Sequence, residues 1–356
     1  MLKKMLIFSL LPFLLFPLSG CWDNRDINHR VMPISIGVAK MDEGYKVFLQ
    51  IPEPSSESLG TRIVTGEGET INQIIDNISV NMESAVDLLH VKVIVVDKRL
   101  AEEGLNDLIS GFIRSRDVSA KAVIAICDDN IDQFFESMEN AEGGEGTILL
   151  DYFEKYSGWD PHVALSRVWE VYRSSHSYTR DVAIPMIKRG QTTFLEIVGS
   201  AVIKNGRLVE VISSDETLLY NAFNNKSTRG KIEILDDASV MILSNDTDYK
   251  AEFTDQTPHL QTTFNFSVMI LETNGNPSAQ DIKMNLEELL LDRYKALIVK
   301  LKTSEADILG IGQHFRKEIP RKDLKNWRSD YYPNLAFNPI IQVDIQNYGN
   351  LKHTTN

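Results

Sequence analysis

The sequence is poor in cysteine. Its 356 residues include only Cys21 and Cys127, too few for the framework of disulfides that holds small secreted domains together. Cys127 ends the apolar run at residues 122–127, which is typical of a thiol buried in a strand rather than of a reactive one. The hydrophobic content of 43% and charged content of 24% instead indicate an ordinary globular protein with cores of its own.

Catalytic signatures are missing as well. None of the seven histidines has metal-binding spacing, and neither a Gly-x-Ser-x-Gly elbow nor a Gly-Lys-Ser/Thr phosphate loop is present. The glycines at residues 66–68 lack the third glycine of a dinucleotide site, and Glu67 and Glu69 would repel a pyrophosphate. Asp160 and His162 form the nearest carboxylate–histidine pair, which a loop turn explains better. We therefore expect no enzyme, no metal and no cofactor.

Positive charge is in deficit. Lys and Arg number 37 against 50 Asp and Glu, a formal net charge of −13. Such an acidic chain disfavours nucleic acid as a partner and is repelled by anionic lipid headgroups. Beyond the N-terminus, no apolar run approaches the length that spans a bilayer, so any attachment to a membrane has to be made in another way.

The N-terminus is the one strongly apolar stretch. Lys3 and Lys4 precede the run at residues 5–17, in which Ser9 is the only polar side chain. A spanning helix needs about 20 apolar residues, so this run predicts a secretory signal peptide, residues 1–20, rather than a transmembrane segment.

Leu18, Ser19, Gly20 and Cys21 follow this run. Their order resembles the bacterial lipobox, and the alternative is an ordinary signal peptide with a cysteine nearby. The resemblance implies cleavage between Gly20 and Cys21 and a covalent lipid on Cys21, an S-diacylglycerol with an N-acyl chain. Two or more acyl chains anchor a protein stably, at about 0.8 kcal/mol per buried CH₂. Cleavage would remove Lys3 and Lys4 and leave 35 cationic against 50 acidic residues, a net charge of −15.

The first half of the remaining chain alternates between strand and helix patterns. Strands are expected at residues 31–39, 45–51, 62–65, 91–96, 122–127 and 182–187, and helical spacing recurs at residues 71–89, 100–113 and through much of 130–176. This rhythm predicts a mixed sheet with helices packed on it.

The second half is richer in strands. We expect strands at residues 194–203, 207–212, 231–235, 238–243, 262–271 and 340–345, a short helix capped by Ser214 or Asp215, and a long amphipathic helix after Ser278. Asn205-Gly206 is a strong hairpin turn, and Ser278 with Asp281 resembles a capping box.

These patterns predict an α+β, or mixed α/β, multi-domain protein whose C-terminal part is mainly antiparallel sheet plus a long helix. The expected divisions are a signal peptide at 1–20, an N-terminal α/β domain at 21–190, a strand-rich domain at 191–260 and a C-terminal α+β domain at 261–356. Residues 191–356 could equally form one unit.

The residues after the lipobox resemble a known family. Cys21, Trp22, Asp23 and Arg25 match the Cys-Trp-Asp-x-Arg-Glu signature of the C subunits of spore germinant receptors, the Ger(x)C lipoproteins, although Asp26 stands where Glu is usual. Two later stretches, from Gly199 to Val209 and from Asp307 to Gly312, also resemble the family.

The resemblance implies a lipoprotein at the outer face of the spore inner membrane, beside two polytopic subunits of the same receptor, that helps nutrients to trigger germination. It leaves open whether this subunit contacts the nutrient. Trp22, Asp23 and Arg25 would lie close to the bilayer and are candidates for docking a partner subunit, or they merely cap the first strand. A solute-binding lipoprotein of a nutrient importer is the alternative function.

Overall fold

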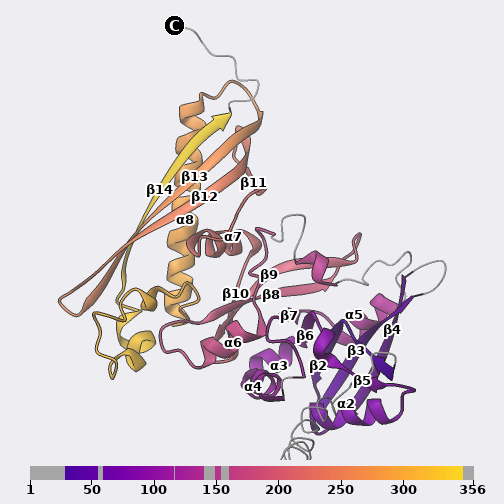
Figure 1. The fold of residues 1–356 in the computed structure, drawn as a ribbon. Helices are drawn as coiled ribbons and strands as arrows, with labels where there is room; N and C mark the ends of the chain where they lie inside the picture. The colour runs from indigo at the N-terminus through magenta and orange to yellow at the C-terminus, as the bar shows by residue number, and fades with distance from the viewer. Residues whose placement is uncertain (1–28, 55–58, 116, 140–148, 154–159, 348–356) are drawn as a thin grey trace, which may run out of the picture.

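The computed structural model describes residues 29–54, 59–115, 117–139, 149–153 and 160–347. These residues form two bodies joined at an angle, one built on an eight-stranded sheet and the other on a four-stranded sheet (Figure 1). A separate two-stranded parallel pair, β1 (Arg30–Val31) with β5 (Ala85–Val86), lies where the described chain begins.

The larger sheet has the strand order β10-β9-β8-β7-β6-β2-β3-β4. Its strands are β2 (Ser35–Lys40), β3 (Tyr45–Pro54), β4 (Leu59–Gly68), β6 (Val93–Asp97), β7 (Val123–Cys127), β8 (Val182–Arg189), β9 (Leu195–Lys204) and β10 (Arg207–Ile212). The central strands β2, β6, β7 and β8 are parallel, and antiparallel hairpins flank them on both sides. The parallel centre is almost wholly apolar, as expected when both faces of a sheet are covered.

Helices cover both faces of this sheet. α2 (Ile71–Val80), α3 (Lys98–Glu103), α4 (Asn106–Ser115) and α6 (Val168–Ser175) share one core with alternate strand residues such as Ile94 and Val96. α5 (Ile131–Glu139) and the short 3-10 helix η5 (Leu149–Tyr152) pack on the other face, with Val93 and Val95. The two-residue period of a strand therefore divides this body into two cores.

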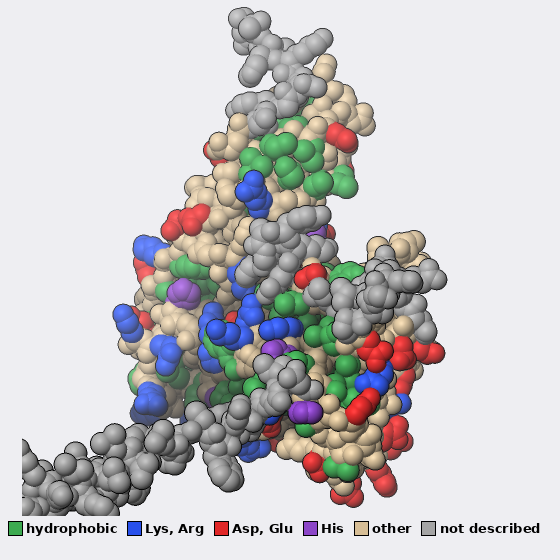
Figure 2. Space-filling model, turned by 45° about the vertical axis from the view of Figure 1, so that its right-hand side comes forward, with side chains coloured by type: hydrophobic (Ala, Val, Ile, Leu, Met, Phe, Trp, Pro, Cys, Tyr) green, Lys and Arg blue, Asp and Glu red, His purple; other side chains and the backbone are tan. Residues whose placement is uncertain are grey.

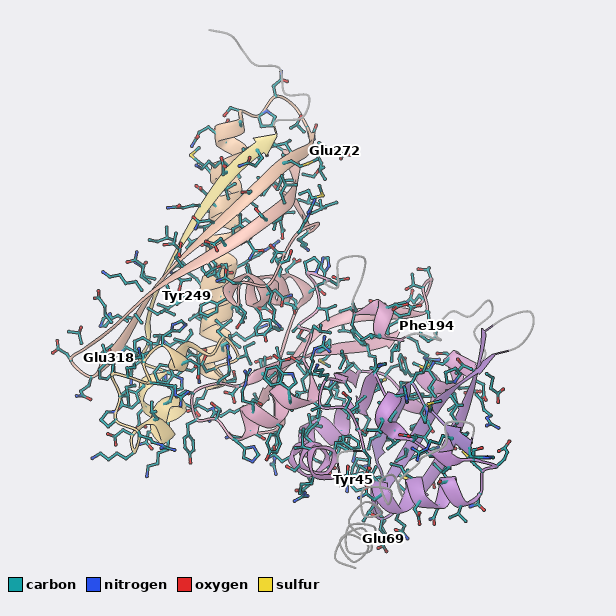
Figure 3. All side chains as sticks on the ribbon, in the orientation of Figure 1. Tyr45, Glu69, Phe194, Tyr249, Glu272 and Glu318 are labelled. Atoms are coloured by element: carbon teal, nitrogen blue, oxygen red, sulfur yellow. The ribbon has the colours of Figure 1, made fainter. Side chains whose placement is uncertain are left out.

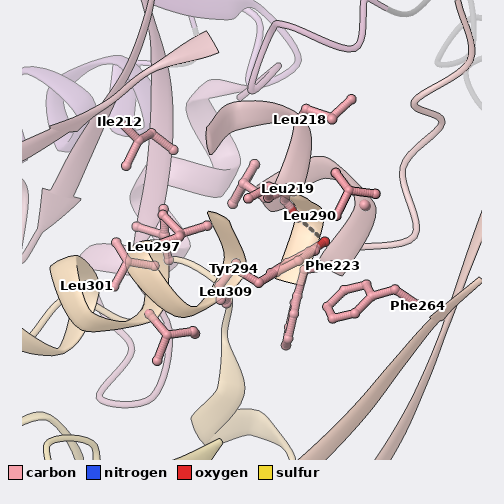
Figure 4. Packing of buried hydrophobic residues seen from close by; sticks show 14 of the residues in the cluster. Ile212, Leu218, Leu219, Phe223, Phe264, Leu290, Tyr294, Leu297, Leu301 and Leu309 are labelled. Atoms are coloured by element: carbon pink, nitrogen blue, oxygen red, sulfur yellow. Dashed lines mark hydrogen bonds between the residues drawn. The ribbon is translucent and has the colours of Figure 1, made fainter. Parts of the chain in front are cut away.

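The second body consists of the sheet β11-β12-β13-β14 and two helices, α7 (Ser214–Phe223) and α8 (Ala279–Thr303). Its strands are β11 (Ile232–Ile234), β12 (Ala238–Thr254), β13 (Thr257–Thr273) and β14 (Ala336–Asn347). In its core, Tyr294 of α8 stacks on Phe264 of β13 with ring centroids 4.0 Å apart. Its hydroxyl donates a hydrogen bond to the Leu219 carbonyl of α7 at 2.9 Å (Figure 4), so one side chain ties both helices to the sheet.

The predicted fold class is confirmed, and so are several local signals. Asn205 and Gly206 adopt positive φ angles of 52° and 81° in the β9–β10 hairpin. Ser278 caps α8 in a reciprocal capping box with Asp281. Cys127 is fully buried in β7. Strong turn and cap chemistry acts within a few residues, which is why the sequence predicts it well.

The predicted helix over residues 71–89 is wrong beyond Val80. α2 ends there, with Asn81 as its C-cap, and β5 (Ala85–Val86) pairs with β1 (Arg30–Val31). The apolar residues at 82, 86 and 89 continue the helical spacing, but pairing with a distant strand overrides it.

Three other element predictions need correction. The single helix expected at residues 100–113 is two helices, because Gly104 at φ 139° ends α3. α7 is capped by Ser213, with Glu216 completing a capping box, not by Ser214 or Asp215. The strands expected at 238–243 and 262–271 are 17 residues each, since they pair with one another along almost their whole length.

The proposed domain boundary near residue 190 falls in the turn between β8 and β9, and the one at 260 falls inside β13. Independent folding of the divided units stays a prediction. Among the described residues, no helix is long and apolar enough to cross a membrane.

Candidate functional site

The predicted site residues lie outside the described residues. These are the lipobox residues Leu18, Ser19 and Gly20, the lipidation residue Cys21, and the docking candidates Trp22, Asp23 and Arg25. Their roles stay predictions, and the described structure begins eight residues after Cys21.

The chain enters the described fold through a small polar clamp. The Arg30 guanidinium forms an ion pair with the Asp87 carboxylate, both side chains being largely buried. Burial works against the ionised form of Asp87, but hydrogen bonds from the Leu89 amide and from Arg30 outweigh it and lower the pKa of Asp87. The first strand is thus fixed to the body by charge as well as by pairing with β5.

A groove with a volume of about 520 Å³ opens beside this clamp. It is lined by Arg30, by residues of α2 and by the end of α4 with the loop that follows it. Its apolar floor includes Ile75, Phe112 and Val118, and its rim includes Asp76. The groove therefore lies at the point where the N-terminal segment leaves the body.

The family-like stretch from Asp307 to Gly312 forms a second, buried polar centre. Asp307 is completely buried and accepts hydrogen bonds from the amides of Ile311 and Gly312, both at 2.8 Å. A third comes from the Trp327 indole N–H at 2.9 Å. Because these donors satisfy both carboxylate oxygens, the side chain acts as a hub for the segment around it.

Glycine is needed at two positions of this stretch. Gly310 has φ 69°, and a Cβ there would lie 2.5 Å from the Arg180 Nε. A Cβ on Gly312 would lie 2.6 Å from the Trp327 ring. The ring also stacks on Phe315, with centroids 5.5 Å apart. The Asp-x-Leu-Gly-x-Gly pattern is therefore a consequence of close packing around an indole and a guanidinium.

Asp181, just before β8, joins this centre to the larger sheet. Its carboxylate accepts two hydrogen bonds from Arg328, at 2.9 Å from Nε and 2.7 Å from an Nη atom. It also accepts the Asp307 amide at 2.8 Å, and its own amide donates to the Asp307 carbonyl at 2.8 Å. We call Asp181, Asp307, Trp327 and Arg328 the buried junction.

The junction separates charges from water. Asp181 and Arg328 are 2% and 8% exposed, so their forked pairing replaces the water that each ion gives up. Burial, together with the negative charge of Asp181, raises the pKa of Asp307 to about 6, although its amide and indole donors act in the opposite direction. The junction is thus a structural device rather than a proton-transfer site open to substrate.

Other candidate chemistry in the described residues is weak. No group of three or more His, Cys, Asp or Glu side chains there could hold a metal ion. Burial raises the pKa of the Cys127 thiol to about 12, so it is unreactive near neutral pH. The Asp160 carboxylate accepts the His162 amide at 2.9 Å in a local turn, as the loop interpretation predicts. The same turn brings the His162 ring nitrogen Nδ1 to 2.9 Å from the carboxylate.

Two family models cover almost the whole chain. Residues 23–189 match "Spore germination protein N-terminal domain", and residues 198–349 match "Spore germination B3/ GerAC like, C-terminal". The chain belongs to the Ger(x)C family of germinant receptor C subunits. This confirms the resemblance and favours germination over the importer alternative.

Relatives of Ger(x)C type are matched over nearly their full length. The chain is 22% identical to spore germination protein A3 of Bacillus subtilis (strain 168), covering 93% of this chain and 95% of the relative. It is 21% identical to spore germination protein KC of the same organism, covering 98% and 97%. The crystal structure of the GerBC protein has a similar fold, with a TM-score of 0.58, 16% identity and coverage of 88% of this chain and 97% of that chain.

The buried junction bridges the two family-matched regions. Asp181 lies in the N-terminal match, whereas Asp307, Trp327 and Arg328 lie in the C-terminal one. Sequence reasoning identified the 307–312 stretch but missed Asp181 and Arg328, which are 147 residues apart. The local sequence shows an arginine, Arg328, directly after a core tryptophan, but this pattern does not indicate that Asp181 is its partner.

Replacing Asp307 by Asn should destabilise the protein. The side-chain NH₂ of the introduced asparagine would face a backbone or indole N–H, so that about 1–3 kcal/mol of unfolding free energy is lost. Urea unfolding of the mature chain measures this loss. The exposed substitution Asp255→Asn is the matched control and should change little.

The loss should also depend on pH. A pKa raised from 3.8 to about 6 means that the folded state favours protonated Asp307. This contribution is complete below pH 3.8 and disappears as the pH rises through about 6. The stability difference between wild type and Asp307→Asn should therefore shrink as the pH rises from 3.8 to about 6 and stay constant above that range; a difference that grows between these pH values contradicts the assignment.

Proposed function

We propose that this Ger(x)C chain is a lipid-anchored subunit of a spore nutrient germinant receptor that acts by contact with polytopic partner subunits. Its place would be the outer face of the spore inner membrane. Membership of the germination family carries the proposal, and the names of its relatives, spore germination proteins A3, KC and B3, agree with it.

Anchoring through Cys21 is supported by the lipobox-like order of residues 18–21. It is also consistent with the described helices, none of which could cross a membrane. Nine residues lead from Cys21 to Arg30, so an extended tether reaches at most roughly 30 Å. The body would thus stay close to the bilayer.

Action by contact rather than catalysis is supported by the chemistry of the body. Within the described part of the chain, no set of side chains could hold a metal, and the Cys127 thiol is buried. Trp22, Asp23 and Arg25 would meet a neighbour at the membrane, since arginine offers forked hydrogen bonds and tryptophan a rigid apolar surface. The groove beside Arg30 lies where the segment that carries these three residues joins the body.

Cys21→Ala should abolish the lipid-modified, cleaved form of the protein. Without the lipid, the remaining N-terminal segment is an uncleaved signal sequence, and the mature lipid-modified form should disappear. Fractionation of membranes, with mass spectrometry of the N-terminal peptide, tests this, and Asn24→Ala is the control. A processed and membrane-bound Cys21→Ala protein would show that another element anchors the chain.

Arg25→Ala, with Cys21 intact, should weaken partner binding while folding is unchanged. A docking arginine contributes about 2 kcal/mol, or roughly 30-fold in affinity. Co-purification with the polytopic subunits and nutrient-triggered germination measure the effect, and Arg229→Ala on the exposed surface is the control. Loss of folding would assign Arg25 to the first strand, and micromolar binding of a nutrient by the isolated body would refute action by contact alone.

A further inference from the structure

The segment between Gly312 and Trp327 carries a dense group of exposed cations. Five lie within ten residues: Arg316, Lys317, Arg321, Lys322 and Lys325. With Glu318 and Asp323, residues 316–325 have five cationic and two acidic side chains, a net charge of +3. We call this stretch the basic ridge. In a chain of net charge −13, it is a local reversal of sign.

The cations of the basic ridge have no carboxylate partner among the described residues. Within the described ranges, their head groups make a single hydrogen bond, from an Arg316 Nη to the Gln313 side chain at 3.3 Å. Several cations elsewhere are paired: Lys46 contacts Asp132, and Lys300 contacts Glu216 at 2.8 Å. Unpaired head groups keep their full attraction for an external anion.

The ridge is held rigidly from below. Phe315, Ile319 and Leu324 alternate with the cations and are buried in the second body's core. Phe315 stacks on Trp327, which is fixed by Asp307 of the buried junction. The buried apolar side chains already fix the backbone of this segment. The charged side chains are therefore held at the surface without a further loss of backbone entropy.

Figure 3 places Glu318 of the ridge at the left edge of the second body, and Tyr45 and Glu69 at the bottom of the first body. Figure 2 shows Lys and Arg side chains gathered on the left and acidic ones on the lower right. The nearby β12–β13 tip adds exposed Asp255 and a Lys250–Glu252 pair, and exposed Asp330 follows the ridge. The two unpaired acidic residues offset part of the ridge's positive charge.

We infer that the basic ridge contacts the anionic phospholipid headgroups of the membrane to which the chain is tethered. The inference rests on the proposed lipid anchor, which holds the body within reach of the bilayer. Five separate cations spread over an exposed segment suit a diffuse layer of phosphates better than one small anion, which requires converging donors. The body would then be attached to the membrane at two places, the lipid on Cys21 and the basic ridge, and the second attachment would orient it.

Vesicle binding by the unlipidated mature chain, residues 21–356 with Cys21→Ser, tests this. It should sediment with vesicles of phosphatidylcholine mixed with phosphatidylglycerol, weakly with phosphatidylcholine alone, and less as salt is raised. Each cation near an anionic surface strengthens binding by roughly five-fold. Arg321→Gln, Lys322→Gln and Lys325→Gln together should therefore weaken it on the order of 100-fold.

The control removes the same charge elsewhere. Lys92→Gln, Lys121→Gln and Lys295→Gln change exposed lysines away from the ridge and should leave vesicle binding within a few-fold of wild type. Equal loss in both triple variants, or no preference for phosphatidylglycerol, overturns the inference. Competition by soluble glycerol phosphate at low concentration would indicate a small-anion site and also overturns it. Lipid modification of Cys21 is measured separately, by mass spectrometry. A failure of the proposed lipid anchor can therefore be distinguished from a failure of headgroup binding by the ridge.

Discussion

A buried ion pair joins two segments that lie 147 residues apart in the chain, and together with a shared apolar core it couples the two bodies. Arg328 donates to both oxygens of Asp181, and the Asp307 amide completes the carboxylate's bonding. Breaking one side of such a pair strands a charge away from water and costs about 3–5 kcal/mol. This constraint couples the larger sheet to the C-terminal body and fixes the turn that positions Trp327.

The coupling fixes the position of the N-terminal clamp relative to the basic ridge. The N-terminal segment leaves from the clamp between Arg30 and Asp87, and the basic ridge extends from the segment that Trp327 and Phe315 hold. If the two bodies moved independently, contact at one would carry no information to the other. A subunit that works by contact benefits from a rigid link, because displacement at a partner interface then moves the whole body relative to the membrane.

The strongest local signals were predictable from the sequence, although the α7 cap and the break at Gly104 were not, and long-range pairing was not. The Asn205-Gly206 turn and the Ser278 cap act within a few residues and are confirmed. The helix expected to continue past Val80 fails because β5 pairs with β1, which lies far earlier in the chain. No local pattern in the sequence identifies Asp181 as the partner of Arg328, which lies 147 residues later. Trp22, Asp23 and Arg25 lie outside the described residues and stay predictions.

Whether the buried junction holds the two bodies in one fixed orientation can be measured as a distance between them. Spin labels at Lys92→Cys in the first body and Met284→Cys on α8, both exposed, report their separation by pulsed electron paramagnetic resonance; Cys127 is buried. If the junction fixes the two bodies, the labels should give one narrow distance distribution in the wild-type background and a broad one with Arg328→Ala. A broad or multiple distribution with the junction intact would contradict it.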